Sequence, residues 1–226
     1  MPSIHAGWTA AQVRAAEQPL LDAGEPLMQR AAAGLATEIE RVLAEREARP
    51  GRVLVLAGSG NNGGDALFAA AALAADGRPV TIVPLGSRLH EEGLAAALQA
   101  GAVEAPSAGP DVVAQLARDA DVIVDGILGT GAAASPALRS PAREVVAAVL
   151  AAPSAAAVVA VDLPSGLSPD DGRVFEPLLP ADVTVTFGAG KAGLLLPPGA
   201  GVAGRVVLVD LGLAPYLRGD PVVEDA

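Results

Sequence analysis

The side chains best suited to chemistry in this sequence are three aspartates and one lysine. Asp65 lies in a glycine-rich segment, Asp125 and Asp162 each end an apolar run, and Lys191 follows a further apolar run. A positioned carboxylate can transfer a proton and stabilise a positive charge that develops during a reaction. Three carboxylates brought close together also repel one another and any phosphate, so we expect a nearby positive charge to offset them.

Two sources of that positive charge are available. A hard cation prefers oxygen ligands, which Asn62, Asp125 and Ser165 supply. Lys191 is the second source. Each of these side chains, and Asp65 with them, also has a purely structural interpretation, as a helix cap, a strand end, a turn or a solvated loop residue.

The chain is organised around residues 52–72, which would position these groups. Residues 52–57 form a short β-branched and Leu-rich run, typical of a buried parallel strand, and Leu67 begins an Ala-rich stretch that favours a helix. Four glycines and two adjacent asparagines lie between them, more than an ordinary turn needs. A strand that turns through glycines into a helix directs backbone N–H groups at an anion, so this segment predicts an anion or nucleotide site.

The glycine segment fits neither of two common phosphate-binding patterns fully. A G-x-G-x-x-G spacing begins at Gly58, but the dinucleotide fingerprint also requires an acid at the end of the second strand. The second predicted strand, residues 80–83, is followed by no acid, although Arg88 could meet a 2′-phosphate. No Gly-Lys-Ser/Thr follows the glycines, which excludes the nucleoside-triphosphate loop.

Composition and charge exclude several classes of protein. The 226 residues suit one α/β domain, predicted to span residues 1–226, and the formal net charge of −11 argues against a nucleic-acid partner. The chain has no cysteine, and its two histidines, His5 and His90, have no His or Cys nearby to form a zinc site. The N-terminus lacks the features of a signal peptide, and Pro153 interrupts the longest apolar run, so we expect a soluble cytoplasmic protein without a membrane partner.

Strand-like and helix-like stretches alternate along most of the chain. Strands are predicted at residues 52–57, 80–83, 121–125, 156–162, 183–187 and 205–209, and helices at 9–19, 26–45, 67–76, 89–100, 110–118 and 141–151. This alternation predicts an α/β fold with a mostly parallel sheet and helices on both of its faces. The last two strands have no full helix between them, which leaves an antiparallel edge open.

Four motifs occur in order along the chain. They are Gly60-Asn61-Asn62-Gly63-Gly64-Asp65, Val124-Asp125-x-x-Leu128-Gly129-Thr130-Gly131, Val161-Asp162-Leu163-Pro164-Ser165-Gly166, and Ala181-Asp182-x-Thr184-x-Thr186-Phe187 with Lys191. Together with Leu27-Met28-x-Arg30-Ala31, they resemble the NAD(P)H-hydrate epimerase family, also called the YjeF N-terminal domain. The resemblance covers residues 13–213, and four ordered motifs are much more specific than any one of them.

The resemblance implies a Rossmann-like three-layer α-β-α sandwich, a homodimer, a potassium ion as cofactor, and interconversion of the R and S forms of hydrated NADH or NADPH. By the family's motifs, the substrate-binding residues would be Asn61, Asn62, Gly63, Gly64, Asp65, Gly129, Thr130, Gly131, Ala132, Ala133, Ala134, Ser135 and Asp162, and the potassium ligands Asn62, Asp125 and Ser165. In many bacteria this domain is fused to a dehydratase. We therefore expect either a free-standing enzyme that works with an NAD(P)H-hydrate dehydratase or a piece of a larger protein.

The sequence departs from the family's pattern at two places. Ala66 stands where the family usually has Gly, so we expect the start of the helix to approach a ligand less closely. Gly126 and Ile127 replace the usual Ala-Leu or Ala-Ile after Asp125, which predicts a looser turn. Neither change removes a polar ligand.

The implied reaction suits the acidic residues. Epimerising a carbon that bears a hydroxyl group beside a ring nitrogen means breaking and remaking a bond to that carbon. The nitrogen lone pair can expel hydroxide, and water can return on either face of the resulting cation. We expect Asp162 to stabilise this cation and shuttle the proton, with Lys191 as the next candidate for the catalytic group.

Two other functions stay open. The first is an NAD-dependent oxidoreductase, favoured by the glycine spacing and opposed by the missing acid. The second is a non-catalytic nucleotide-binding or scaffold module of the same fold, which would be marked by loss of the aspartates that this chain keeps.

The helices before Pro50 are predicted to form the dimer contact. In the helix at residues 26–45, apolar residues recur at steps of three and four, more than one sheet face obviously needs. They are Met28, Ala31, Leu35, Ile39 and Val42.

Overall fold

A seven-stranded parallel sheet forms the centre of the molecule, in the order β4-β3-β2-β5-β6-β7-β8. The computed structural model describes residues 5–106, 108–132 and 134–224. The strands are β2 (Val53–Ala57), β3 (Val80–Pro84), β4 (Val103–Glu104), β5 (Val122–Gly126), β6 (Ala157–Val161), β7 (Val183–Phe187) and β8 (Arg205–Val209). The six predicted strands are confirmed within one residue at each end. The sequence missed β4, because two residues carry no readable period.

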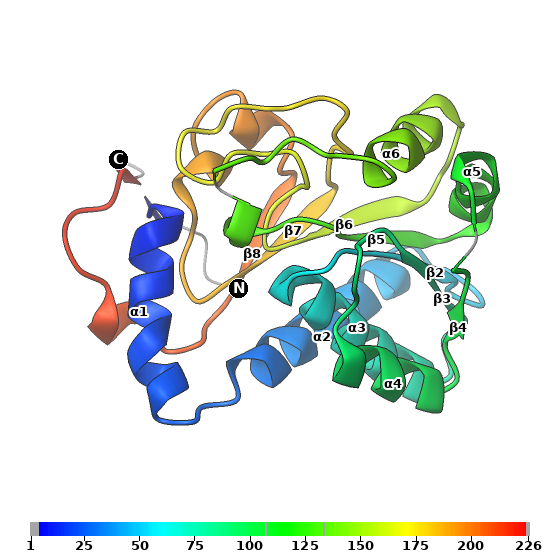
Figure 1. The fold of residues 1–226 in the computed structure, drawn as a ribbon, viewed down its shortest axis with the longest axis horizontal. Coiled ribbons are helices and arrows are strands. Elements are labelled where there is room, and N and C mark those ends of the chain that lie inside the picture. Colours follow the sequence, from blue (N-terminus) through cyan, green and yellow to red (C-terminus); the bar gives the residue numbers. More distant parts are fainter. Residues whose placement is uncertain (1–4, 107, 133, 225–226) are drawn as a thin grey trace.

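Helices cover both faces of the sheet and make the predicted three-layer sandwich. They are α1 (Ala10–Asp22), α2 (Leu27–Glu45), α3 (Asn61–Ala75), α4 (Glu91–Gln99), α5 (Pro110–Asp119) and α6 (Ala142–Ala151). In Figure 1, α2, α3 and α4 lie below the sheet and α5 and α6 above it. Alternate residues of β2 point to opposite faces of the sheet. Val53 and Val55 therefore belong to the core between the sheet and helices α2 and α3, whereas Leu54 and Leu56 pack with α5 and α6.

The order of the strands creates a crevice between β2 and β5. The chain runs outward from β2 to β3 and β4 through α3 and α4, then returns through α5 to the other side of β2. Right-handed crossovers in opposite directions place these two sets of helices on opposite faces. The connections that leave the carboxyl ends of β2 and β5 therefore diverge, which is where open α/β sheets bind ligands.

The sequence did not settle the direction of the last strand of the sheet. In the structure this strand runs parallel to its neighbour, which rules out an antiparallel edge. Strand β8 pairs in parallel with β7, from Val183 opposite Arg205 to Phe187 opposite Val209. The connection between them passes through two 3₁₀ turns, Ala192–Leu194 and Gly199–Gly201, and is long enough to return to the same end of the sheet.

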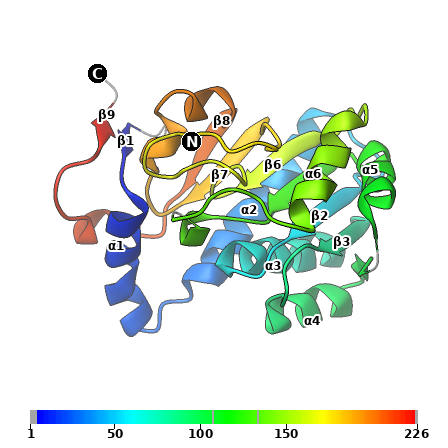
Figure 2. The same ribbon diagram turned by 45° about the horizontal axis from the view of Figure 1, so that its top comes forward.

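Antiparallel pairing occurs instead in a separate two-stranded sheet. Strand β1 (Ala6–Gly7) pairs with β9 (Val223–Glu224), so the first and the last described strands lie side by side next to α1 (Figure 2). The segment after Pro215 is therefore tied to the start of the described chain.

Two helices differ in detail from the prediction. Thr9 caps α1 through a capping box with Gln12, and α1 continues beyond the predicted end at Pro19 to Asp22. The apolar stripe of α2 is buried in this single chain, with Leu35 and Ile39 fully inaccessible. The stripe therefore belongs to the core and gives no support for a dimer contact through α2. Among the described helices, none combines the length and hydropathy that a bilayer crossing requires.

Candidate active site

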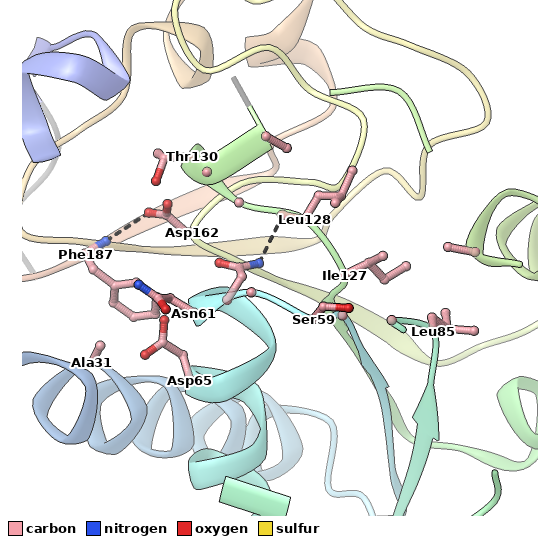
Figure 3. A pocket seen from close by; sticks show the side chains of 18 of the residues that line it. Ala31, Ser59, Asn61, Asp65, Leu85, Ile127, Leu128, Thr130, Asp162 and Phe187 are labelled. Carbon is pink, nitrogen blue, oxygen red and sulfur yellow. Dashed lines mark hydrogen bonds between the residues drawn. The ribbon is translucent and has the colours of Figure 1, made fainter. Parts of the chain in front are cut away.

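A cavity of about 860 Å³ runs across the carboxyl ends of β3, β2, β5, β6 and β7. Because these strands are neighbours in that order, residues after β3 lie at one end of the cavity and residues after β6 and β7 at the other. Figure 3 shows Leu85, Ser59 and Ile127 toward one end, and Asp65, Asp162 and Phe187 toward the other. The site predicted at the rim of the sheet is therefore one continuous cavity.

The glycine-rich segment forms the first turn of α3, which begins at Asn61 rather than near Leu67. Glycine is required here because backbones meet: a Cβ at Gly58 would lie 1.9 Å from the carbonyl oxygen of Ile127, and one at Gly63 would lie 2.1 Å from that of Gly58. Gly64 differs, because a Cβ there would meet side-chain atoms of Met28 at 3.1 Å rather than backbone.

The predicted substrate residues of this segment divide into two groups. Asn61, Asn62 and Asp65 line the cavity, whereas Gly63 and Gly64 are not among its lining residues. The two glycines allow close packing behind the cavity wall, and the polar side chains beside them line the cavity.

The loop after β5 forms the opposite wall. Gly129, Thr130, Gly131, Ala132 and Ser135 line the cavity, but Ala134 does not, and Ala133 lies outside the described residues. The loop is held by two arginines that also line the cavity: Arg14 Nη1 donates to the carbonyl of Thr130 at 2.9 Å, and Arg139 Nη2 to Ser135 Oγ at 3.1 Å.

Asp162 occupies a strained turn directly after β6. Its φ is 66°, in the left-handed region, and Leu163 N–H donates to the carbonyl of Val161 at 2.7 Å, which closes a γ-turn around Asp162. This turn is uncommon for residues other than glycine. The backbone N–H of Asp162 donates to the carbonyl of Val185 at 2.7 Å. Strain of this kind persists where the surrounding structure fixes it and is typical of functional sites.

Lys191 forms a buried ion pair with Asp162. Lys191 Nζ lies 2.5 Å from Asp162 Oδ1, 3.0 Å from Thr186 Oγ1 and 2.8 Å from the carbonyl oxygen of Phe187. Thr186 Oγ1 donates to the same Oδ1 at 3.0 Å. Lys191 is only 2% exposed, so the interpretation of it as a solvated loop lysine is wrong. Asp162 Oδ2 has no partner among the described residues and is left for the cavity that Asp162 lines.

Asp65 is the second carboxylate at this end of the cavity. Burial raises the pKa of Asp65 to about 8, and the negative charges of Asp162 and Glu17 add to this effect while Lys191 opposes it. Asp65 therefore carries a proton at neutral pH and can donate a hydrogen bond. The N-cap of α3 is Gly60, so the interpretation of Asp65 as only a helix cap is wrong. Asp162, bound to Lys191, and Asp65, whose pKa burial raises, thus lie in different electrostatic environments, as in sites where two carboxylates take different roles.

Asp125 and Ser165 belong to a separate polar group behind the cavity. The N–H and Oγ–H of Ser165 donate to the two carboxylate oxygens of Asp125, at 2.8 and 2.6 Å. Asn62 Nδ2 donates to the carbonyls of Leu128 and Val161 at 3.0 and 2.8 Å, and Leu128 N–H donates to Ser165 Oγ at 2.8 Å. The structure thus brings together the three side chains that the sequence assigned to the cation.

The donor atoms of this group suit a potassium ion. Asp125 is 1% exposed and accepts hydrogen bonds from neutral groups only, and burial raises the pKa of its carboxyl group. A cation would stabilise that buried charge, and the side chains and carbonyls offer the oxygen ligands that hard cations prefer. Within the described ranges, no group of three acidic, His or Cys side chains could share a metal. Asp65 and Asp162 influence each other electrostatically, whereas the carboxylate of Asp125 accepts hydrogen bonds from Ser165 and Ile127.

Helix α1 supplies three of the lining residues that the sequence did not identify. Arg14, Glu17 and Leu21 form a stripe along α1 that faces the cavity. Their spacing of three and four places them on one side of a helix, but a basic, an acidic and an apolar residue make no pattern that would single them out.

Comparisons with known proteins identify the family. Residues 24–193 match the family described as YjeF-related protein N-terminus. The chain is 53% identical to the NAD(P)H-hydrate epimerase of Clavibacter michiganensis subsp. michiganensis (strain NCPPB 382), over 92% of this chain and 90% of that protein, and 55% identical to that of Clavibacter sepedonicus, over 93% and 92%.

More distant similarities extend the comparison. The Bifunctional NAD(P)H-hydrate repair enzyme Nnr of Mycobacterium tuberculosis (strain ATCC 25618 / H37Rv) is 45% identical over 89% of this chain but only 40% of its own length. The crystal structure of yeast ynu0, YNL200c, matches the fold with a TM-score of 0.74 at 18% identity, covering all of this chain and 97% of the yeast chain. The chain belongs to the YjeF-related protein N-terminus family.

Proposed function

We propose that the protein is an NAD(P)H-hydrate epimerase, which interconverts the R and S forms of hydrated NADH or NADPH. The observation that carries this proposal is the presence of Asp162, held in a buried ion pair with Lys191, and of Asp65, whose pKa burial raises, at one end of a cavity large enough to hold part of a dinucleotide. Relatives with more than half of their residues identical, matched over nine-tenths of both chains, have that activity in their names.

The charges in the cavity orient the substrate. The carboxylates at the β6 and β7 end would repel phosphates, so the hydrated ring occupies that end. The diphosphate lies against the first turn of α3, whose free N–H groups and positive helix end attract anions, with Arg14 and Arg139 nearby. The adenosine then lies at the end of the cavity lined by Leu85 and Gly86. No acid follows β3 there, so the ribose is not bound by a carboxylate as it is in the dinucleotide fingerprint.

The chemistry follows from this placement. A carboxylic acid first protonates the hydroxyl group on the carbon beside the ring nitrogen. The nitrogen lone pair then expels this group as water, and Asp162 stabilises the resulting cation. Water then adds to either face of the ring and gives up a proton to a carboxylate. Lys191 and Thr186 fix the direction of the Asp162 carboxylate, so little reorganisation is required as the cation forms.

We propose that a potassium ion binds Asn62, Asp125 and Ser165. This ion would supply fixed positive charge beneath the phosphate end of the cavity, where Asn62 also lines the wall. The support for it is the oxygen-rich group around Asp125 and the lack of any positive side chain bonded to that carboxylate among the described residues.

We also propose a homodimer and cooperation with a dehydratase. The homodimer rests on the family resemblance, since the α2 stripe is buried within one chain; a monomer mass in sedimentation across micromolar concentrations would refute it. A partner dehydratase is supported by the bifunctional relative, most of whose length lies outside the match. The cytoplasmic location stays a prediction.

The experiment that tests the function follows the ratio of R to S hydrated NADH by chromatography, starting from each purified epimer. With the protein, both samples should approach the same ratio much faster than without it. Binding without acceleration would favour the scaffold module, and an absorbance change that depends on NAD and a second substrate would favour the oxidoreductase.

A further inference from the structure

Residues 85–88 directly follow β3, at the end of the cavity where the adenosine is proposed to lie. Leu85, Gly86 and Ser87 line the cavity, and Arg88 comes next in the chain. The chemistry described above uses none of their polar groups. In the dinucleotide fingerprint, this position decides how the adenosine ribose is recognised: an acid binds a free 2′-hydroxyl group, whereas an arginine accommodates a 2′-phosphate.

Direct contacts hold this segment against the glycine-rich segment after β2. Leu85 N–H donates to the carbonyl of Ala57 at 2.8 Å, and a Cβ added at Gly86 would lie only 2.2 Å from Ser59 Oγ. Arg88 N–H donates to the same Ser59 Oγ at 3.4 Å. Ser59 lines the cavity beside Leu85 (Figure 3). The backbone of Arg88 therefore stands at the rim of the adenosine end.

The same end of the cavity is suited to an adenosine group. Four of its lining residues belong to one buried apolar cluster on the face of the sheet that α5 and α6 cover: Leu85, Ile127, Leu138 and Ala142. An apolar wall of this kind accepts a flat base. The carboxylates that line the cavity come from α1, from α3 and from the end of β6, and none of the described lining residues in segments 85–87 and 127–142 is acidic. These two segments therefore present no repelling carboxylate to a phosphate.

Arg88 carries a charge that no described acidic group neutralises. The residue is exposed, and its guanidinium takes part in none of the ion pairs within the described part of the chain. Glu91 and Glu92, in the first turn of α4, are the nearest acids in the sequence, and neither pairs with it. On a chain with a formal net charge of −11, a phosphate needs local donors and cations that offset the overall repulsion.

We propose that the segment after β3 forms a subsite for the 2′-phosphate of hydrated NADPH. The guanidinium of Arg88 binds two phosphate oxygens, a geometry that its planar fork favours. The hydroxyl groups of Ser59 and Ser87 donate to the phosphate as well, since Ser59 Oγ accepts from Arg88 N–H and keeps its own proton available. Hydrated NADPH is therefore the preferred substrate. The identity of the substrate rests on the proposed epimerase function, whereas the subsite is testable with adenosine nucleotides alone.

The first test measures the binding of three nucleotides by calorimetry. They are adenosine 5′-monophosphate, adenosine 2′,5′-bisphosphate and adenosine 3′,5′-bisphosphate. The two bisphosphates carry the same charge, so they separate recognition of the 2′ position from a general attraction of anions. The parent protein should bind the 2′,5′-bisphosphate about tenfold or more tightly than either of the others. Equal affinity for the two bisphosphates would overturn the proposal.

Matched variants locate the phosphate on the protein. Arg88→Met removes the charge at an exposed position and should abolish the preference for the 2′,5′-bisphosphate. Arg118→Met makes the same change at an exposed position of α5, outside this cavity, and should keep the preference. A preference that survives in Arg88→Met overturns the proposal. If Arg139→Met then removes it, the 2′-phosphate lies on the opposite wall.

The second test compares the KM values for hydrated NADPH and hydrated NADH. A contact made equally in the ground state and the transition state changes KM and not kcat. Arg88→Met should therefore raise the KM for hydrated NADPH about tenfold, toward that for hydrated NADH, whereas Arg118→Met should change neither.

The two tests distinguish failure of the subsite from failure of the function. A parent protein that epimerises both hydrates with equal KM and prefers neither bisphosphate would refute the subsite and leave the epimerase function intact. A parent that prefers the 2′,5′-bisphosphate through Arg88 but inverts neither hydrate would support the subsite and refute the epimerase function.

Discussion

Ala66 on α3 and Gly126 at the end of β5 pack directly against each other. A Cβ added at Gly126 would lie 2.6 Å from the Cβ of Ala66, well inside contact distance. Both positions depart from the pattern of the family, which usually has Gly at the first and Ala at the second. The two departures are therefore one exchange, in which the methyl group has moved from the strand to the helix.

This pairing corrects two expectations from the sequence. Ala66 is 1% exposed and is not among the residues that line the cavity, so its methyl group does not hold the helix away from a ligand. Gly126 is a buried residue within β5, so the turn after Asp125 is not loosened at that point.

The exchange predicts a compensating pair of substitutions. Gly126→Ala alone should destabilise the protein by about 1–3 kcal/mol, because the added methyl group overlaps that of Ala66. Ala66→Gly alone should cost about 1 kcal/mol through helix propensity. The double variant should be more stable than Gly126→Ala alone. Urea unfolding of all four proteins measures the coupling, and additive effects would contradict the contact.

The ion pair between Asp162 and Lys191 predicts linked effects on activity and stability. Asp162→Asn should lower the epimerisation rate on the order of a hundredfold or more. It should still fold, because asparagine tolerates the positive φ and its amide oxygen can accept from Lys191, but with a lower melting temperature since a buried ammonium loses its counter-charge.

A double variant without charge at residues 162 and 191 separates the effect on activity from the effect on stability. Lys191→Met in the Asp162→Asn background removes the uncompensated charge and should recover stability without recovering activity. If Asp162→Asn epimerises hydrated NADH within a few-fold of the parent, Asp162 is not the catalytic group and Lys191 becomes the next residue to test.

Asp65 should make stability depend on pH. Its pKa is about 8 in the folded protein and about 3.9 in an unfolded chain, so the folded state binds more protons between these values. Its contribution to the free energy of unfolding therefore falls as pH rises through this window, by at most about 1.4 kcal/mol per pH unit. Relative to the parent, Asp65→Asn should gain stability steadily from pH 4 to pH 8. A constant difference across that range would show that Asp65 is ionised in the folded protein.

Potassium should stabilise the folded protein through Asp125. Melting temperatures in potassium chloride and in a tetramethylammonium salt of equal ionic strength should differ, because a ligand at 100 times its Kd adds about 2.7 kcal/mol. In Asp125→Asn the difference should disappear. An equal melting temperature of the parent in both salts, together with water alone at Asn62, Asp125 and Ser165 in a high-resolution map, would refute the potassium site.

The sequence by itself determined the strands and most of the helices, and it identified the polar groups that follow the strands. This was possible because a buried parallel strand is a local β-branched run, and the residue after it reaches the same rim in every strand. Asp125 and Asp162 could be identified as rim residues from the sequence, because each directly follows an apolar run.

Only the tertiary structure decided which of these groups act together. Asp162 pairs with Lys191, 29 residues away, and Asp125 with Ser165, 40 residues away, so the three aspartates that looked alike in the sequence fall into two different environments. Glu17 lines the cavity from α1, and Gly126 packs against Ala66 where a strand meets a helix. Burial and charge at each carboxylate depend on these long-range contacts, which no local pattern of residues encodes.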